Sequence, residues 1–243
     1  MKHRPEDGES PIPSGAGGSR APNPTLAEEP RVAAYFGAAY EAVSRYARML
    51  GSEGERLGLI GPGEVGRLWS RHILNCAAVG PHLPPSGTLV DVGSGAGLPG
   101  VVLAAMRPDL RTILIEPMER RVAWLNEVCA ALGLSSVEVV RGRAEDLHDQ
   151  VLAEAVTARA VAPLRRLVPW TMPLLVRGGV LLAMKGGRAA EELRDAEATI
   201  WTAGGGQTEI LTAGTIDGAD PTTLVRIVRV GDPQPPPARR RSR

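Results

Sequence analysis

The chain has few cysteines, few aromatic residues, little net charge and no long apolar run. Cys76 and Cys129 are the only cysteines among its 243 residues. They are too few for a disulfide framework or a cysteine-based zinc site, so we expect no metal and a reducing, cytoplasmic setting. No apolar run approaches the roughly 20 residues that a membrane span needs, and the first ten residues lack the apolar segment of a secretory signal. The formal net charge is +1, so any basic surface must be local.

The two ends differ from the middle of the chain in composition. Residues 1–24 are rich in Pro, Gly and Ser and lack apolar periodicity, which predicts a disordered tail. Residues 231–243 combine prolines with a cluster of arginines, Arg239, Arg240, Arg241 and Arg243. This second tail is either a solvated terminus or an arm that binds RNA phosphates. We expect one folded domain between them, over residues 25–230.

Two helices are predicted before residue 80. Apolar residues recur at helical spacing from Val32 to Leu50, and Gly51 follows as a C-terminal stop. All three tyrosines and the only phenylalanine fall in this first helix, where core packing explains them by spacing. A second helix is expected from Glu64 to Val79. Its buried face would hold Val65, Leu68, Ile73, Cys76 and Val79.

From residue 88 to residue 230, strand patterns alternate with helix patterns. Strands are predicted near 88–92, 112–116, 137–141, 156–159 and 179–184, and helices near 99–106, 119–132, 163–176 and 188–203. Such alternation implies an α/β fold with a parallel sheet covered on both faces. Glu209–Leu211 and Thr223–Val230 then form two strands joined only by turn residues, most simply antiparallel. A doubly wound, Rossmann-like sheet ending in an antiparallel hairpin is the Class I methyltransferase plan.

The segment LVDVGSGAGLPG, residues 89–100, is the most informative of the chain. Three glycines, Gly93, Gly95 and Gly97, follow a strand that ends in Asp91 and precede a helix. Glycines are needed where a strand turns sharply into a helix and a ligand approaches the backbone. Glu116 ends the next apolar run, where an acid can bind a ribose hydroxyl. The unit therefore predicts a nucleotide-like cofactor site.

The acid before the glycines separates two cofactor classes. Asp91 would repel the pyrophosphate of a dinucleotide, whereas S-adenosylmethionine has no phosphate and carries a sulfonium and an ammonium group. We therefore expect Asp91 to contact S-adenosylmethionine.

Further motifs carry a resemblance to a known family. They are RHILN at 71–75, LIEPMERRVAWL at 114–125, GRAED at 142–146, VTARAVAPL at 156–164 and LAMKG at 182–186. With the glycine-rich segment and in this order, the chain resembles the glucose-inhibited division protein B family, the RsmG methyltransferases. The resemblance covers roughly residues 30–230. It implies methyl transfer from S-adenosylmethionine to N7 of one guanine in the 530 loop of 16S ribosomal RNA, with the RNA or the small ribosomal subunit as partner.

The resemblance also implies cofactor contacts, carried over motif by motif to Gly93, Leu98, Ala144, Glu145 and Arg159. Glu145 lies just beyond the third strand, where a carboxylate can accept from the amine of adenine. Cys76 stands where the family pattern leads us to expect serine, and the arginine-rich tail lies outside the shared core.

Four cationic side chains are candidates for contact with the RNA or the reacting base. Arg159 and Lys185 end the fourth and fifth strands, at the edge where open α/β sheets bind ligands, and we expect both to serve the reaction. Arg71 and His72 would face the RNA from the second helix. For Lys185 simple exposure, and for His72 a satisfied core position, are the alternatives.

Two other functions remain open from the sequence. A small-molecule methyltransferase of the same fold would be expected to carry an aromatic-rich lid, and only 3% of the residues are aromatic. A non-enzymatic RNA-binding protein with a relict fold is disfavoured by the intact set from Asp91 to Gly97 with Glu116.

Overall fold

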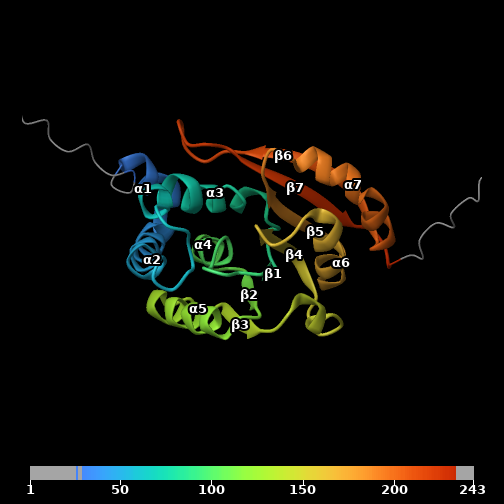
Figure 1. Ribbon diagram of the computed structural model, residues 1–243, viewed down its shortest axis with the longest axis horizontal. Helices are drawn as coiled ribbons and strands as arrows, with labels where there is room; N and C mark the ends of the chain where they lie inside the picture. The colour runs from blue at the N-terminus through green and yellow to red at the C-terminus, as the bar shows by residue number, and fades with distance from the viewer. Residues whose placement is uncertain (1–25, 27–28, 234–243) are drawn as a thin grey trace, which may run out of the picture.

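One mixed sheet organises the molecule. The computed structural model describes Leu26 and residues 29–233; the predictions for residues 1–24 and 234–243 lie outside this part. Its seven strands are ordered β3-β2-β1-β4-β5-β7-β6 (Figure 1). The strands are β1 Thr88–Val92, β2 Arg111–Glu116, β3 Val137–Arg141, β4 Ala153–Arg159, β5 Leu175–Lys185, β6 Gly205–Ala213 and β7 Thr222–Arg229.

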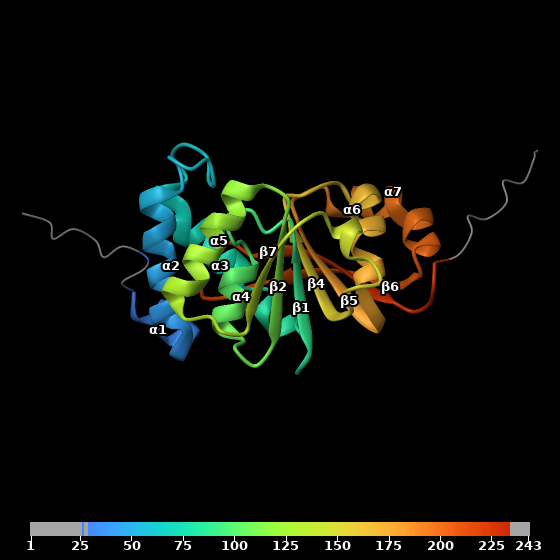
Figure 2. The ribbon, with the colours of Figure 1, turned by 90° about the horizontal axis from the view of Figure 1, so that it is seen from below.

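Helices cover both faces of this sheet, as Figure 2 shows. One face is covered by α1 Pro30–Phe36, α2 Tyr40–Glu53, α3 Leu74–Ala77, α4 Gly100–Met106 and α5 Glu119–Leu132. The other face is covered by α6 Leu164–Thr171 and α7 Ala189–Thr202. Neighbouring residues of β1 take opposite sides: Leu89 belongs to the core under α2, α4 and α5, and Val90 to the core under α6 and α7. Among the described helices, none is long and apolar enough to span a bilayer.

The predicted fold class is confirmed. Strands β1 to β5 are parallel, β7 runs antiparallel to β5, and β6 runs antiparallel to β7. Parallel order brings the carboxyl ends of β1, β2, β4 and β5 to one edge, at Val92, Glu116, Arg159 and Lys185. The predicted candidates at these strand ends therefore share one edge of the sheet.

The first predicted helix is two helices, and its predicted stop was wrong. α1 ends at Phe36 because Gly37 has a φ of +51°, which a right-handed helix does not admit. A 3₁₀ turn, Gly37–Ala39, leads into α2. α2 passes through Gly51 and ends at Glu53, and Gly54 N still donates to Leu50 O at 2.8 Å.

The second predicted helix is a regular α-helix only in its last turn. A 3₁₀ turn at Val65–Arg67 leads into a π-helical segment, Leu68–Ile73, before α3. Its wider turn is seen where Leu74 N donates to Trp69 O, five residues back. Val65 lies outside this coil and is 40% exposed, so its predicted burial was wrong. The other predicted core positions are buried: Leu68, Ile73, Cys76 and Val79.

Two boundaries differ around β5 and β6. The helix predicted over 163–176 ends at Thr171 and is followed by a 3₁₀ turn, Met172–Leu174. β5 begins at Leu175, four residues before the prediction, because the strand continues through Gly178, whose φ is +85°. β6 extends over Gly205–Ala213, beyond the predicted 209–211.

Candidate functional site

The glycine-rich turn after β1 folds tightly against β2 and the loop after β4. Gly93 N and Ser94 N both donate to Ile115 O, at 2.9 and 3.1 Å. Gly93, Gly95 and Gly97 have φ values of +69°, +57° and +104°, which disfavour L side chains. A Cβ at Gly93 would lie 2.8 Å from Val161 Cγ2, and one at Gly97 2.6 Å from Val101 Cγ2. Glycine at these two positions therefore permits close packing.

One carbonyl at the tip of the turn is held from two helices. Ala96 O accepts from Tyr46 Oη of α2 at 3.0 Å and from Trp124 Nε1 of α5 at 2.8 Å. Tyr46 is 1% exposed, so it packs in the core, as predicted from its spacing, and also fixes the turn. The helices before the sheet thereby hold the backbone that forms the site.

Glu116 faces the turn from the end of β2. Its Oε2 accepts from Gly95 N at 2.9 Å and its Oε1 from Met118 N at 2.9 Å. The side chain of Glu116 is 2% exposed, and Arg121 Nη1 lies 3.9 Å from its Oε2. These contacts fix the carboxylate at the wall of a cavity.

The side chain of Asp91 points into the protein core and does not line this cavity. It is fully buried, and its carboxylate accepts from Gly100 N at 3.0 Å and from Thr157 Oγ1 at 3.0 Å. Burial raises its pKa from 3.8 to about 6, against the lowering effect of these hydrogen bonds. Asp91 is absent from the residues that line the cavity. The structure thus places Asp91 below the turn, where it joins β1 to β4 and to the start of α4.

A cavity of about 580 Å³ opens above the turn. It brings together all the predicted cofactor-contacting residues except Asp91 and Gly97: Gly93, Gly95, Leu98, Glu116, Ala144, Glu145 and Arg159 line it. Its wall also includes Leu59, Ile60 and Gly61, which the sequence analysis missed. Their short run between glycines has neither helical nor strand periodicity, so nothing local indicated that they lie over the site.

A second cavity, of about 730 Å³, is also lined by the loop after β4. Arg159, Ala160 and Val161 line both cavities. Ala160 has a φ of +55°, a strained value for a residue with a Cβ. Backbone strain of this kind often accompanies functional sites. The loop of residues 159–161 therefore forms part of the wall of both cavities, with a strained backbone at Ala160.

Lys185 lines the second cavity but is not free. Its Nζ donates to Ala162 O at 2.6 Å and lies 2.8 Å from Glu192 Oε2, and its side chain is 9% exposed. Glu192 in turn accepts from Leu164 N at 2.9 Å. Lys185 therefore braces the loop that contains Ala160, which differs from the simple exposure considered for it.

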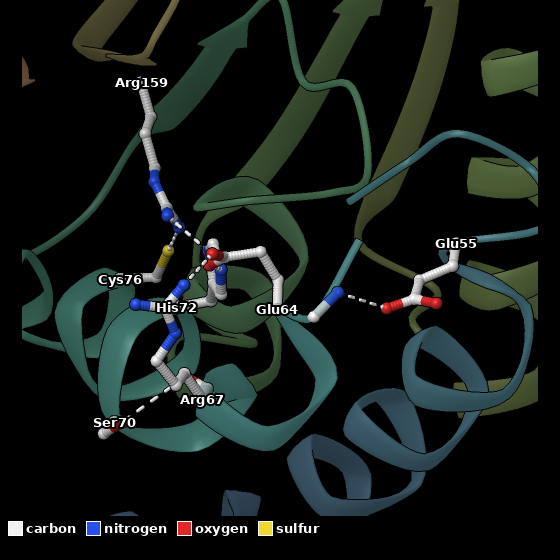
Figure 3. A network of polar contacts seen from close by, with 8 residues as sticks. Glu55, Glu64, Arg67, Ser70, His72, Cys76 and Arg159 are labelled. Carbon is white, nitrogen blue, oxygen red and sulfur yellow. Dashed lines mark hydrogen bonds and ion pairs between the residues drawn. The ribbon is translucent and has the colours of Figure 1, made fainter. Parts of the chain in front are cut away.

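Arg159 sits in a polar network, which Figure 3 shows. Its Nη1 donates to Cys76 Sγ at 3.1 Å, and its Nη2 donates to His72 Nδ1. On the far side of the imidazole, His72 Nε2 donates to Glu64 Oε2 at 2.7 Å. Burial raises the pKa of the Cys76 thiol to about 11, so the sulfur is a neutral acceptor. Arg71 beside His72 is exposed.

Comparison with known proteins settles the family. The model of the family described as rRNA small subunit methyltransferase G matches residues 39–217, more than half of the chain. The chain belongs to this family. The resemblance inferred from the motifs is thereby confirmed, and the chain is a methyltransferase.

Individual relatives cover most of the methyltransferase chain. It is 46% identical over 232 residues to a Salinispora tropica protein named ribosomal RNA small subunit methyltransferase G, covering 91% of this chain and 95% of that one. It is 56% identical over 161 residues to a protein of the same name from Beutenbergia cavernae, covering 66% and 76%. An S-adenosylmethionine-dependent O-methyltransferase structure from Thermotoga maritima superposes with a TM-score of 0.52 at 14% identity, over 71% and 72% of the two chains. That last likeness concerns the fold alone.

The residues predicted to contact RNA lie in different environments in this methyltransferase. His72 and Arg159 meet at the cavity, Arg71 lies on the surface beside it, and Lys185 is turned into the loop after β4. Arg239, Arg240 and Arg241 lie outside the described residues. Glu64 was not predicted as a site residue, because only the tertiary fold brings it to His72.

Proposed function

We propose that this methyltransferase transfers a methyl group from S-adenosylmethionine to N7 of a guanine in the 530 loop of 16S ribosomal RNA, in the cytoplasm. The observation that carries the proposal is the convergence of the glycine-rich turn, Glu116 and Arg159 on one cavity. The relatives named as methyltransferases of small-subunit ribosomal RNA support the choice of substrate.

The cavity fits a cofactor of this size and polarity. Its volume of about 580 Å³ lies within the ~300–1,000 Å³ common for small-molecule sites. A Cβ at Gly95 would meet nothing closer than Gly93 O at 3.7 Å, so a side chain there would occupy cavity space instead of the ligand. Glu116 supplies a fixed carboxylate for ribose hydroxyls. Ala144 would lie against the adenine ring, and Glu145 would accept from its amine.

The reaction asks for alignment more than for acid–base chemistry. Guanine N7 has a free lone pair, so the chain needs no general base. Bound S-adenosylmethionine supplies a methyl group on an activated sulfonium leaving group. The residues of the chain hold the two reactants in line and exclude water, which is the main way such a displacement is accelerated.

Besides the cofactor contact that the resemblance implies for it, we assign Arg159 to the acceptor base. It lines both cavities, and a guanidinium readily donates to guanine O6. The base must be reached in a single-stranded loop or by extrusion from a helix. Arg71 would contact that RNA from the π-helical segment, and Arg239, Arg240 and Arg241 would add contacts to phosphate. His72 would act through Arg159, since both of its ring nitrogens are engaged within the protein. Lys185 would act by holding the loop after β4.

Primer extension after borohydride and aniline treatment tests the proposal, because this treatment cleaves RNA at N7-methylguanine. The purified chain, S-adenosylmethionine and either 16S RNA or small ribosomal subunits should give one new stop in the 530 loop. Arg159→Ala should lower the single-turnover rate at least about tenfold, roughly 1.4 kcal/mol in barrier height, with little change in melting temperature.

Arg177→Ala is the matched control. Arg177 is exposed on β5, far along the strand from Lys185, and its replacement should leave the rate unchanged. Absence of the stop with both RNA forms, while S-adenosylmethionine still binds, would contradict the RNA substrate and favour a small-molecule acceptor.

A further inference from the structure

The hydrogen-bond partners of the Arg159 guanidinium are neutral groups. Within the described residues, its guanidinium bonds to His72 Nδ1 and Cys76 Sγ, and no carboxylate forms an ion pair with it. The negative charge in this network is that of Glu64, on the other side of the imidazole, with Oε2 2.7 Å from His72 Nε2. Glu64 therefore reaches Arg159 only through the ring of His72 (Figure 3).

These contacts fix the state of the imidazole. A guanidinium has only donors, so the nitrogen that faces Arg159 must be an acceptor. His72 Nδ1 is therefore unprotonated and Nε2 carries the hydrogen that Glu64 accepts. The chain of donors runs in one direction, from Arg159 to His72 and from His72 to Glu64.

The network leaves part of Arg159 available. A guanidinium has five N–H donors, and two are engaged by His72 and Cys76. Bidentate donation by arginine to guanine O6 and N7 is common, yet it would cover the N7 atom that must react. Holding one edge of the guanidinium on the protein side restricts how its remaining donors meet the base.

We propose that His72 and Glu64 are positioning residues for Arg159: the imidazole, oriented by the Glu64 carboxylate, holds the guanidinium so that its free donors meet guanine O6 and leave N7 open. The inference rests on the proposed function. Glu64 also ends the segment that contains Ile60 and Gly61, which line the first cavity. The same contact therefore ties that wall to the base-binding arginine.

The arrangement has a pH dependence. Burial lowers the pKa of His72 below its usual 6.5, the hydrogen bond to Glu64 raises it, and the charges of Arg159 and Arg71 lower it. Among the described residues, the charged groups that act on the ring are Glu64, Arg159 and Arg71. When His72 takes up a proton, Nδ1 becomes a donor and the contact with Arg159 breaks. Methylation should therefore fall on the acid side with a midpoint below 6.5.

A double-mutant cycle tests the proposal. Glu64→Gln keeps the shape of the side chain and loses its charge, and should lower the single-turnover rate about fivefold at saturating S-adenosylmethionine. In an Arg159→Ala background the same change should have no further effect, since the group it positions is gone. Removing the carboxylate also lowers the pKa of His72, so the acid limb of the Glu64→Gln profile should move to lower pH.

Glu55→Gln is the control. Glu55 lies on the same segment and accepts from Gly63 N at 2.8 Å, so it undergoes the same chemical change away from Arg159 and should keep the wild-type rate. Rate losses of Glu64→Gln and Arg159→Ala that simply multiply would refute the positioning role. So would an unshifted acid limb.

Nitrogen-15 NMR of His72 gives a readout that needs no activity. At pH 8 the wild-type ring should be the Nε2–H tautomer. Arg159→Ala should shift the Nδ1 resonance, because Nδ1 loses its donor, while Glu64 keeps the hydrogen on Nε2. The Nδ1–H tautomer in the wild type would overturn the inference even if Glu64→Gln failed to fold. A wild-type chain that leaves the RNA unmethylated would instead refute the proposed function, and this inference with it.

Discussion

The buried carboxylate of Asp91 makes the stability of the chain depend on pH in an unusual direction. The fully buried side chain keeps two hydrogen bonds, from Gly100 N and Thr157 Oγ1, each 3.0 Å long. Burial nevertheless outweighs them and raises the pKa to about 6, from 3.8. The folded chain therefore holds a proton on Asp91 more tightly than the unfolded chain does.

The sign and size follow from linkage. A group whose pKa is raised on folding contributes stability that is complete below its unfolded pKa and is lost as pH rises through its folded pKa. The interval from 3.8 to about 6 corresponds to about 3 kcal/mol, at about 1.36 kcal/mol per pH unit. About 2 kcal/mol of this stabilisation should be lost as pH rises from 4 to 7, because part of the change lies below pH 4.

Asp91→Asn isolates this effect. The amide oxygen can accept from Gly100 N, and the amide nitrogen can donate to Thr157 Oγ1, whose hydroxyl lies 3.4 Å from Val90 O and can donate there. The variant should fold, and its free energy of unfolding, measured with urea from pH 4 to pH 7.5, should gain about 2 kcal/mol relative to the wild type across that range.

The exposed Asp109 provides the control, because its contact with Arg107 lowers its pKa below 3.8. Between pH 5 and 7.5, Asp109→Asn should run parallel to the wild type. Parallel curves for Asp91→Asn would show that Asp91 does not titrate in this window, and the reasoning from burial would be refuted.

Three further predictions concern the turn and the tail. Gly95→Val places branched carbons in the cavity at a φ of +57°. Calorimetry should then show that S-adenosylmethionine binding is lost, while the circular dichroism spectrum stays native. Unchanged affinity would show that the ligand binds elsewhere. Tyr46→Phe removes one of two donors to Ala96 O and should cost about 1 kcal/mol in urea unfolding, since Trp124 still satisfies the carbonyl; a loss several times larger would mean that Tyr46 alone holds the turn. Deleting residues 233–243 should weaken RNA binding mostly at low salt and flatten the salt dependence, with a single-strand slope of about −0.7 per phosphate contact. Identical salt slopes would identify the tail as a solvated end.

Local sequence signals predicted the sheet and the turn because both depend on short-range patterns. Short apolar runs that alternate with helix patterns marked the strands, and closely spaced glycines marked the turn after β1, where the structure has positive φ values. The same kind of reasoning failed at Gly51, where tertiary packing of α2 sustains the helix. At Gly37 the sequence predicted a continuous helix, and the structure has a break. The break needs a backbone conformation that glycine permits but does not require.

The direction of polar side chains was harder to predict than their position. Alternation along β1 places Asp91 on the same face as Leu89, below α4, and this was a signal that its charge faces inward. The contact between His72 and Arg159 joins residues 87 positions apart. Glu64 acquires its role only through that contact, so no local pattern in the sequence could have indicated it.

The loop formed by Arg159, Ala160 and Val161 has a thermodynamic consequence. It belongs to the walls of two cavities at once, so any movement of this loop changes the shape of both. Occupants of the two cavities are then expected to change each other's affinity, and by the same factor in both directions. The methyl donor and the acceptor base would then influence each other's binding through this one loop, without any domain movement.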